Sequence, residues 1–137
     1  MIARSFVDTN IFVYSRDSVN SSKRKKALKL ITTLRQANLL IISYQVVTEF
    51  IAVMDKKYKA PQEELKKDVR LLLDLKPIPV DESVIQQGLK LHQQYNLSWW
   101  DAWIVASSIL AGCKQLYSED LASGASYHGV EVVNPFI

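Results

Sequence analysis

The sequence predicts an α/β fold built around a mostly parallel β-sheet. Short runs of apolar and β-branched residues, typical of buried strands, alternate along the chain with longer amphipathic segments typical of helices. This alternation indicates βαβ units, in which helices connect parallel strands. Two of the short runs are also followed closely by acidic residues, at the strand ends where open α/β sheets bind their ligands.

The composition indicates one domain over residues 1–137. Hydrophobic residues make up 48% of the chain and charged residues 23%, which is ordinary for a globular protein of a size that buries its own core. Cys113 is the single cysteine, so no disulfide forms within the chain and a buried thiol is expected. Arg4 and Asp8 interrupt the apolar N-terminus, and no apolar run approaches the ~20 residues of a membrane span. We therefore expect a cytoplasmic protein without a signal peptide.

The net charge of +3 and the isoelectric point near 9.0 permit a polyanionic partner without establishing one. Four consecutive cations stand where a helix is expected to begin: Lys23, Arg24, Lys25 and Lys26. Cations in a first turn oppose the helix dipole, which favours acids there. The run is explained either by a phosphate-facing role or, as is more common, by a solvated basic surface.

The first predicted strand covers residues 2–7 and is followed by Asp8, Thr9 and Asn10. All three residue types cap helices well, so a short helix is expected from Ile11. Asp8 then has two interpretations. It is the N-cap of that helix, or it is a ligand for a metal or phosphate at the carboxyl end of the strand. Spacing alone favours the cap.

A helix beginning at the basic run is expected to end near Ala37, before a strand at residues 39–42. That strand is apolar throughout, which is typical of a strand covered on both faces. Ser43 follows it and is suited to cap a helix over residues 44–58. Glu49 lies beside the apolar stripe of this helix, and periodicity gives no reason to assign it a function.

The middle of the chain continues the alternation. Pro61 suits the first turn of another helix. Residues 77–80 read Pro-Ile-Pro-Val, which predicts a short edge strand bounded by prolines. Asp81 or Ser83 then caps a further helix, which carries Leu91 on its apolar face.

An apolar, alanine-rich helix is expected to begin at Ser98. Asp101, three residues on, gives the spacing of a capping box, so its carboxylate has a structural explanation as well as a functional one. Trp99, Trp100 and Trp103 on the same helix could stack nucleic-acid bases, although core or interface packing is the more common role of such residues.

The last part of the chain predicts two strands. The run Leu116–Tyr117 is followed directly by Glu119 and Asp120, and residues 130–133 follow a loop at residues 124–129. Because parallel strands end at the same edge of a sheet, Asp8 and Asp120 are expected to approach each other. Asp101 precedes its strand by a whole helix, and the spacing does not predict where it lies.

Four stretches, in order and with plausible separations, resemble the acidic motifs of the PIN-domain ribonucleases, particularly the toxins of the VapC type. They are residues 6–11 (FVDTNI), 43–50 (SYQVVTEF), 97–102 (LSWWDA) and 116–121 (LYSEDL). Residues 132–136 (VVNPF) are similar to the tail of one subgroup. Each motif is weak alone, but the four together span essentially the whole chain.

The resemblance implies a three-layer α/β/α PIN-like domain with a central sheet of four to five strands. It also implies an acidic site formed by Asp8, Glu49, Asp101 and Asp120, with Glu119 as a neighbour that could share in it. Asn10 and Ser118 would orient the carboxylates. The basic run at Lys23, Arg24, Lys25 and Lys26 would attract RNA phosphates.

Physical chemistry agrees with such a site. Crowded carboxylates repel one another unless they are protonated or neutralised by a cation. Oxygen ligands favour Mg²⁺ or Mn²⁺ over zinc, and such an ion can activate water and offset charge on a scissile phosphate. The motifs contain no arrangement of histidine, cysteine and serine for nucleophilic catalysis.

The expected function is that of a Mg²⁺- or Mn²⁺-dependent endoribonuclease, similar to the toxin of a type II toxin–antitoxin module. The resemblance implies three partners: an RNA substrate, a cognate antitoxin and a second copy in a homodimer. The first alternative is a non-catalytic PIN-like domain that binds RNA or protein. The second is an α/β phosphoacceptor domain, which would need a lysine at the end of a late strand, whereas Lys114 precedes its strand.

Overall fold

A five-stranded sheet forms the centre of the protein. The computed structural model describes residues 2–137. The strands are β1 (Ser5–Val7), β2 (Leu40–Ile41), β3 (Gln115–Tyr117), β4 (Ser126–Tyr127) and β5 (Val130–Val133), in the spatial order β2-β1-β3-β5-β4. All neighbours pair in parallel except β4, which is antiparallel to β5. The predicted α/β fold with a mostly parallel sheet of four to five strands is therefore confirmed.

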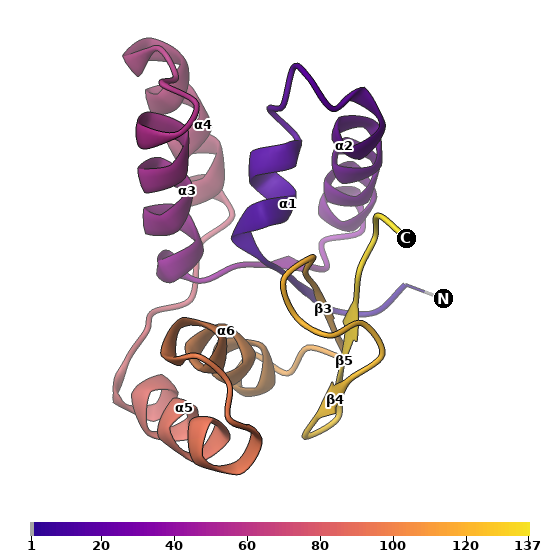
Figure 1. The fold of residues 1–137 in the computed structure, drawn as a ribbon, viewed down its shortest axis with the longest axis vertical. Coiled ribbons are helices and arrows are strands. Elements are labelled where there is room, and N and C mark those ends of the chain that lie inside the picture. The colour runs from indigo at the N-terminus through magenta and orange to yellow at the C-terminus, as the bar shows by residue number, and fades with distance from the viewer. Residues whose placement is uncertain (1) are drawn as a thin grey trace.

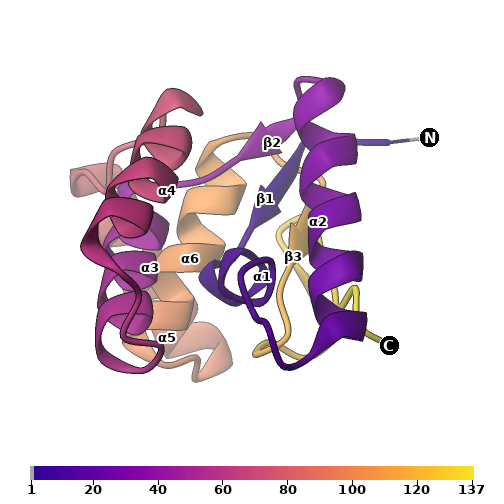
Figure 2. The ribbon, with the colours of Figure 1, turned by 90° about the horizontal axis from the view of Figure 1, so that it is seen from above.

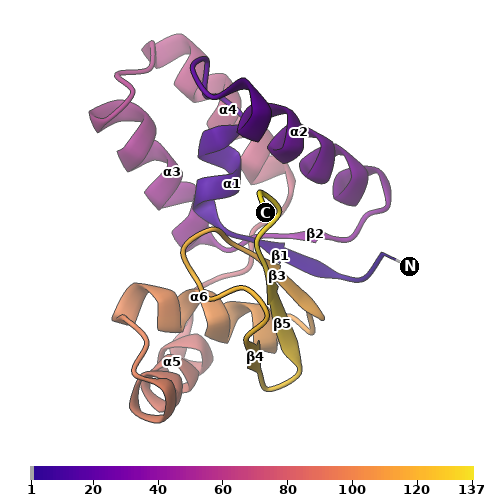
Figure 3. The same ribbon diagram turned by 45° about the vertical axis from the view of Figure 1, so that its right-hand side comes forward.

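Six helices surround the sheet (Figure 1): α1 (Thr9–Tyr14), α2 (Ser21–Gln36), α3 (Tyr44–Lys56), α4 (Gln62–Asp74), α5 (Glu82–Tyr95) and α6 (Trp99–Leu110). Helices α1 to α4 gather on one side, and α5 and α6 form a packed pair on the other (Figure 3). Figure 2 shows α1 between α2 and α3, and it contacts both. None of the helices in residues 2–137 is long and apolar enough to cross a bilayer.

The core lies on both faces of β1, whose three residues are all buried. Phe6 of β1, Leu116 of β3 and Val132 of β5 are fully buried. Cys113, just before β3, is 4% exposed, as expected for a packed thiol, and burial raises its pKa to about 11. Gly88 of α5 allows α5 and α6 to approach, because a Cβ there would lie 2.3 Å from Cδ1 of Trp103.

Two strand predictions were wrong in detail. Residues 77–80 do not form a strand: Ile78 makes a single parallel bridge to Ser43, because the flanking prolines have no N–H to donate to a ladder. The predicted loop at residues 124–129 contains β4. His128 and Gly129 turn β4 into β5 with φ angles of 50° and 89°, and positive φ at both central residues is the geometry of a tight hairpin turn.

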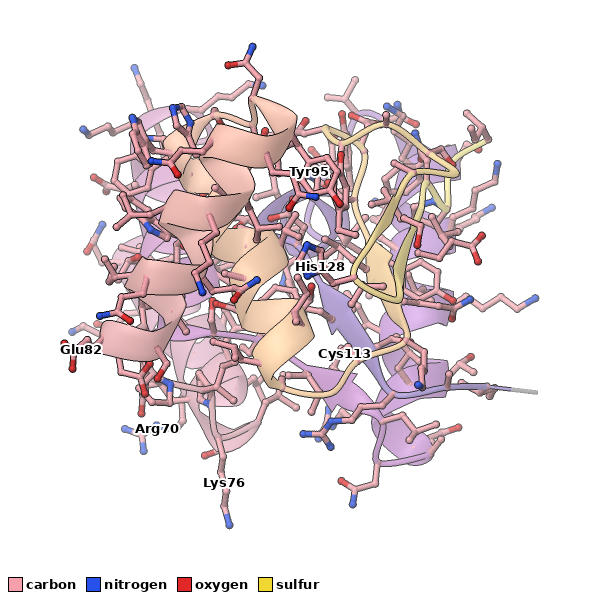
Figure 4. The ribbon with its side chains drawn as sticks, turned by 90° about the horizontal axis from the view of Figure 1, so that it is seen from below. Arg70, Lys76, Glu82, Tyr95, Cys113 and His128 are labelled. Atoms are coloured by element: carbon pink, nitrogen blue, oxygen red, sulfur yellow. The ribbon has the colours of Figure 1, made fainter. Side chains whose placement is uncertain are left out.

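The hairpin also packs against α5. Figure 4 labels Tyr95 of α5 and His128 of the turn, whose ring centroids lie 6.1 Å apart. Nε2 of His128 lies 3.3 Å from Oε1 of Gln94. Of the two predicted caps of α5, Asp81 and Ser83, the structure has Asp81. Its carboxylate accepts a hydrogen bond from the Val84 N–H at 3.2 Å.

Candidate active site

Asp8 and Asp120 approach each other because β1 and β3 are neighbours that end at the same edge of the sheet. Val7 pairs with Tyr117, and the Asp8 N–H donates to the Tyr117 carbonyl at 3.0 Å. The hydroxyl of Ser118, which is fully buried, donates to Oδ2 of Asp8 at 2.8 Å. The same Ser118 oxygen accepts the Asp120 N–H at 3.1 Å. One serine therefore links the two strand ends.

The Asn10 amide lies between the two carboxylates. Its Nδ2 is 3.1 Å from Oδ2 of Asp120 and 3.5 Å from Oδ2 of Asp8. Its Oδ1 accepts the backbone N–H of Glu119 at 3.2 Å. Asn10 thus contacts the loop after β3 through both polar atoms of its side chain: Nδ2 donates to Asp120, and Oδ1 accepts from Glu119. It and Ser118 contact the acids that they were predicted to orient.

Asp8 also caps α1, so its two interpretations are compatible. Its Oδ1 accepts the Thr9 N–H at 2.7 Å, whereas Oδ2 faces Ser118 and Asn10. Each oxygen of the carboxylate therefore has a different set of partners. Asp8 is 5% exposed, which is unusual for an acid that has no cationic partner among the described residues.

Glu49 and Asp101 enter the same region from two different helices. The Gln45 side-chain amide donates to Oε1 of Glu49 at 2.7 Å and to the carbonyl of Trp100 at 3.1 Å. Gln45 therefore ties α3 to the first turn of α6, next to Asp101. Gln45 was not predicted to belong to the site, although its position one turn before Glu49 was a signal in the sequence.

Only half of the predicted capping box is present. The Ser98 hydroxyl oxygen accepts the Asp101 N–H at 3.1 Å. The reciprocal bond, from the Ser98 N–H to the Asp101 carboxylate, does not occur within residues 2–137. The Ser98 side chain nevertheless acts on the Asp101 carboxylate, because a hydrogen bond from it opposes the rise of the Asp101 pKa.

Burial and neighbouring negative charge raise the pKa of Asp8, Glu49 and Asp101. Burial is the main cause that lifts the pKa of Asp8 to about 7, and the negative charges of Glu49 and Asp120 add to it. Burial likewise raises the pKa of Glu49, with further contributions from the charges of Asp101 and Asp120. The pKa of Asp101 is raised by burial and by Asp120. Asp120 acts on all three, so the four acids form one electrostatically coupled group.

An open cavity of about 240 Å³ lies over this group. Glu49 and Asp120 both face it, whereas Asp8 and Asp101 are not among its lining residues. The lining residues are Thr9, Asn10, Val13, Tyr14, Glu49, Val53, Lys57, Tyr58, Glu119 and Asp120. A separate hollow of about 170 Å³, between α1, α2 and α4, contains none of the four acids.

Glu119 lines the same cavity and makes contacts that the other acids do not share. Its carboxylate pairs with the Lys23 ammonium and accepts the Tyr14 hydroxyl at 2.8 Å. These two partners outweigh partial burial and lower the pKa of Glu119. Phe136 packs edge-on against Tyr14 with ring centroids 5.1 Å apart, where the C-terminal segment returns beside α1 (Figure 3).

The four cations of the predicted basic run therefore differ in their contacts. Lys23 is occupied by Glu119 and Tyr14. Lys25 and Lys26 are exposed, Arg24 is partly buried, and within residues 2–137 none of these three forms a side-chain hydrogen bond or ion pair. Their contact with RNA remains a prediction.

The donor set fits a hard divalent cation. All four acids offer oxygen, and Asp8 and Asp120 are both within hydrogen-bonding reach of one Asn10 amide. Thr9 lines the same cavity with a buried hydroxyl that has no partner in the described chain. No three acid, histidine or cysteine side chains of residues 2–137 form a ready-made cluster. Mg²⁺ does not require one, because it commonly binds through one or two carboxylates and keeps several waters.

The chain belongs to the PIN domain family, because the sequence model of that family matches residues 5–122. A comparison with curated proteins found no match.

Solved structures of toxin–antitoxin proteins share the fold. A chain of a toxin–antitoxin complex from Klebsiella pneumoniae is 23% identical, with a TM-score of 0.65 over 96% of this chain and 97% of that one. A chain of VapBC2 from Rickettsia felis, bound to a DNA fragment from its promoter, is 16% identical, with a TM-score of 0.70 over 93% and 96%. VapC20 from Mycobacterium tuberculosis, described as a toxin that cleaves the sarcin–ricin loop, is 13% identical, with a TM-score of 0.62 over 85% and 89%.

Proposed function

We propose that the protein is a Mg²⁺- or Mn²⁺-dependent endoribonuclease that hydrolyses RNA phosphodiester bonds. The observation that carries the proposal is the coupled group of four acids, Asp8, Glu49, Asp101 and Asp120, beside one open cavity at the carboxyl edge of the sheet. Membership of the PIN domain family supports it, because PIN domains are typically nucleases.

In this proposal the four acids Asp8, Glu49, Asp101 and Asp120 together hold the cation. Ser118 and Asn10 fix the orientation of the Asp8 and Asp120 carboxylates through the bonds described above. A bound Mg²⁺ or Mn²⁺ would supply an activated water and offset charge on the scissile phosphate. The raised pKa of Asp8 means that its carboxyl retains protons near neutral pH, so cation binding would release a proton from it.

We further propose that the protein acts in the cytoplasm as the toxin of a toxin–antitoxin pair, binds a cognate antitoxin protein and forms a homodimer. The Klebsiella and Rickettsia relatives, which were crystallised as toxin–antitoxin complexes, support the antitoxin proposal. Inspection of the neighbouring reading frame for a small DNA-binding protein tests this part cheaply.

The nuclease proposal predicts RNA cleavage that depends on a hard divalent cation. Purified protein incubated with total cellular RNA should yield discrete fragments with Mg²⁺ or Mn²⁺, and an excess of EDTA should stop the reaction because the carboxylates alone cannot activate water. Fragment patterns are read on a denaturing gel. Equal cleavage with and without EDTA would contradict the proposal.

The second candidate is a PIN-like domain that binds RNA or protein without cutting it. The observation that favours this alternative is that only two of the four acids, Glu49 and Asp120, line the cavity. RNA affinity that persists in every metal tested, without any fragment, would distinguish it from the nuclease.

A further inference from the structure

One cation lines the cavity beside the acids. Lys57 immediately follows α3, and Glu49, Val53 and Lys57 are spaced four residues apart, so they share one face of that helix. All three line the cavity, and Lys57 is the single cationic residue among the described residues that do so. A positive charge therefore stands about two helical turns from Glu49 at the same opening.

The Lys57 ammonium is not committed to an acid. No carboxylate of residues 2–137 lies within ion-pair distance of it, and its nearest recorded partner is the Tyr58 ring, whose centroid is 5.5 Å away. The charge of Lys57 contributes weakly to the lowered pKa of Asp17, so that acid is nearby. Asp17 has other partners, however: Oδ1 accepts the Val19 and Asn20 N–H groups at 2.8 and 3.0 Å, and Oδ2 accepts the Tyr58 hydroxyl at 3.5 Å.

Lys23 provides the contrast within the same neighbourhood. It approaches the cavity wall from α2, but Glu119 and Tyr14 already hold its ammonium. Of these two lysines, only Lys57 has its charge available for an anionic ligand.

We propose that Lys57 binds a backbone phosphate of the RNA strand and holds that strand over the acids. This inference rests on the proposed nuclease function. An acidic cavity repels a polyanion, so an available cation on its wall is the feature that a phosphodiester ligand requires. Lysine suits this role because its ammonium is a compact charge on a flexible stem that follows a mobile backbone. A phosphate contact carries no base preference, so Lys57 supports affinity rather than sequence choice.

The test compares Lys57→Gln with Lys56→Gln. Lys56 is an exposed neighbour on the same helix that does not line the cavity, so both variants lose one positive charge. Cleavage of a single-stranded RNA oligonucleotide is measured at increasing substrate concentration. Lys57→Gln should raise KM about 3- to 10-fold with little change in kcat, because the contact is made in the ground state and the transition state alike. Lys56→Gln should match the wild type, and Lys57→Arg should recover most of the affinity.

Binding is measured in an Asp8→Asn background, where the RNA stays intact. There Lys57→Gln should reduce the slope of log affinity against log salt by about 0.7, the value for one lost phosphate contact to a single strand. Similar effects of Lys56→Gln and Lys57→Gln in a protein that cleaves RNA would overturn the inference alone, because they would indicate general attraction. A wild type that neither binds nor cleaves RNA would overturn the proposed function and this inference with it.

Discussion

Substitution of Asp8 with asparagine is expected to lower metal-dependent RNA cleavage at least about 100-fold while the protein stays folded. Asparagine keeps an oxygen to accept the Thr9 N–H, and its amide takes the place of the oxygen that accepts from Ser118 and Asn10. What the variant loses is the negative charge that a divalent cation requires. Initial rates on one RNA substrate, with folding checked by circular dichroism, measure the effect.

The matched control is Asp74→Asn. Asp74 is the exposed last residue of α4 and does not line the cavity, so the same chemical change is made away from the acids. This variant should cleave RNA at the wild-type rate. A folded Asp8→Asn protein with near wild-type activity would exclude Asp8 from the reaction.

The second large effect is on stability: without metal, Asp8→Asn should be more stable than the wild type at pH 8. The pKa of Asp8 is about 7 in the folded protein, mainly because of burial, against 3.8 for an unperturbed group. Ionisation therefore costs more in the folded state than in the unfolded chain. The difference between the two pKa values corresponds to a free energy on the order of 4 kcal/mol at full ionisation.

The direction with pH follows from proton binding. Between pH 4 and pH 7 the folded state holds more protons on Asp8 than the unfolded state, so this group's contribution to stability falls as pH rises through that window. Urea unfolding of the wild type in EDTA should show this decline, and Asp8→Asn should remove most of it. Asp74→Asn should keep the wild-type slope. Parallel pH profiles for wild type and Asp8→Asn would contradict a raised pKa at Asp8.

Metal should reverse the stability difference at neutral pH. A cation that binds the folded wild type stabilises it by mass action, whereas the Asp8→Asn protein has lost one of the proposed ligands. Asp8 would then destabilise the metal-free protein and bind the metal that activity requires. Such a trade-off between stability and function is common.

Much of the fold could be predicted because its local signals agree with its tertiary structure. Strands β1 and β3 are short and apolar, their flanking helices carry clear caps, and both strand ends are followed by acids. Strand β4 could not be predicted, because it has only two residues and pairs with β5 across a tight turn at His128 and Gly129. The composition of this segment is typical of a loop. Residues 77–80 were predicted to form a strand but make only one bridge, because two of the four residues are prolines and have no N–H to donate.

The candidate site was predictable to different degrees. The approach of Asp8 to Asp120 followed from parallel strands ending at one edge. The positions of Glu49 and Asp101 did not, because they depend on how α3 packs beside α6, which local periodicity does not encode. The bond from Gln45 to both Glu49 and the Trp100 carbonyl is a tertiary contact of this kind. For these two acids, motif resemblance supplied what periodicity and spacing could not.

The central claim is that Asp8, Glu49, Asp101 and Asp120 together bind a divalent cation. Paramagnetic broadening of amide signals by Mn²⁺, in isotope-labelled protein and its Asp101→Asn variant, tests it most directly and needs no substrate. Asparagine preserves the backbone N–H that Ser98 caps and removes only the charge. Broadening centred on the four acids, and weaker in the variant, is the predicted result. Unchanged signals around the cavity at millimolar Mn²⁺ would contradict the claim and favour a non-catalytic binding domain.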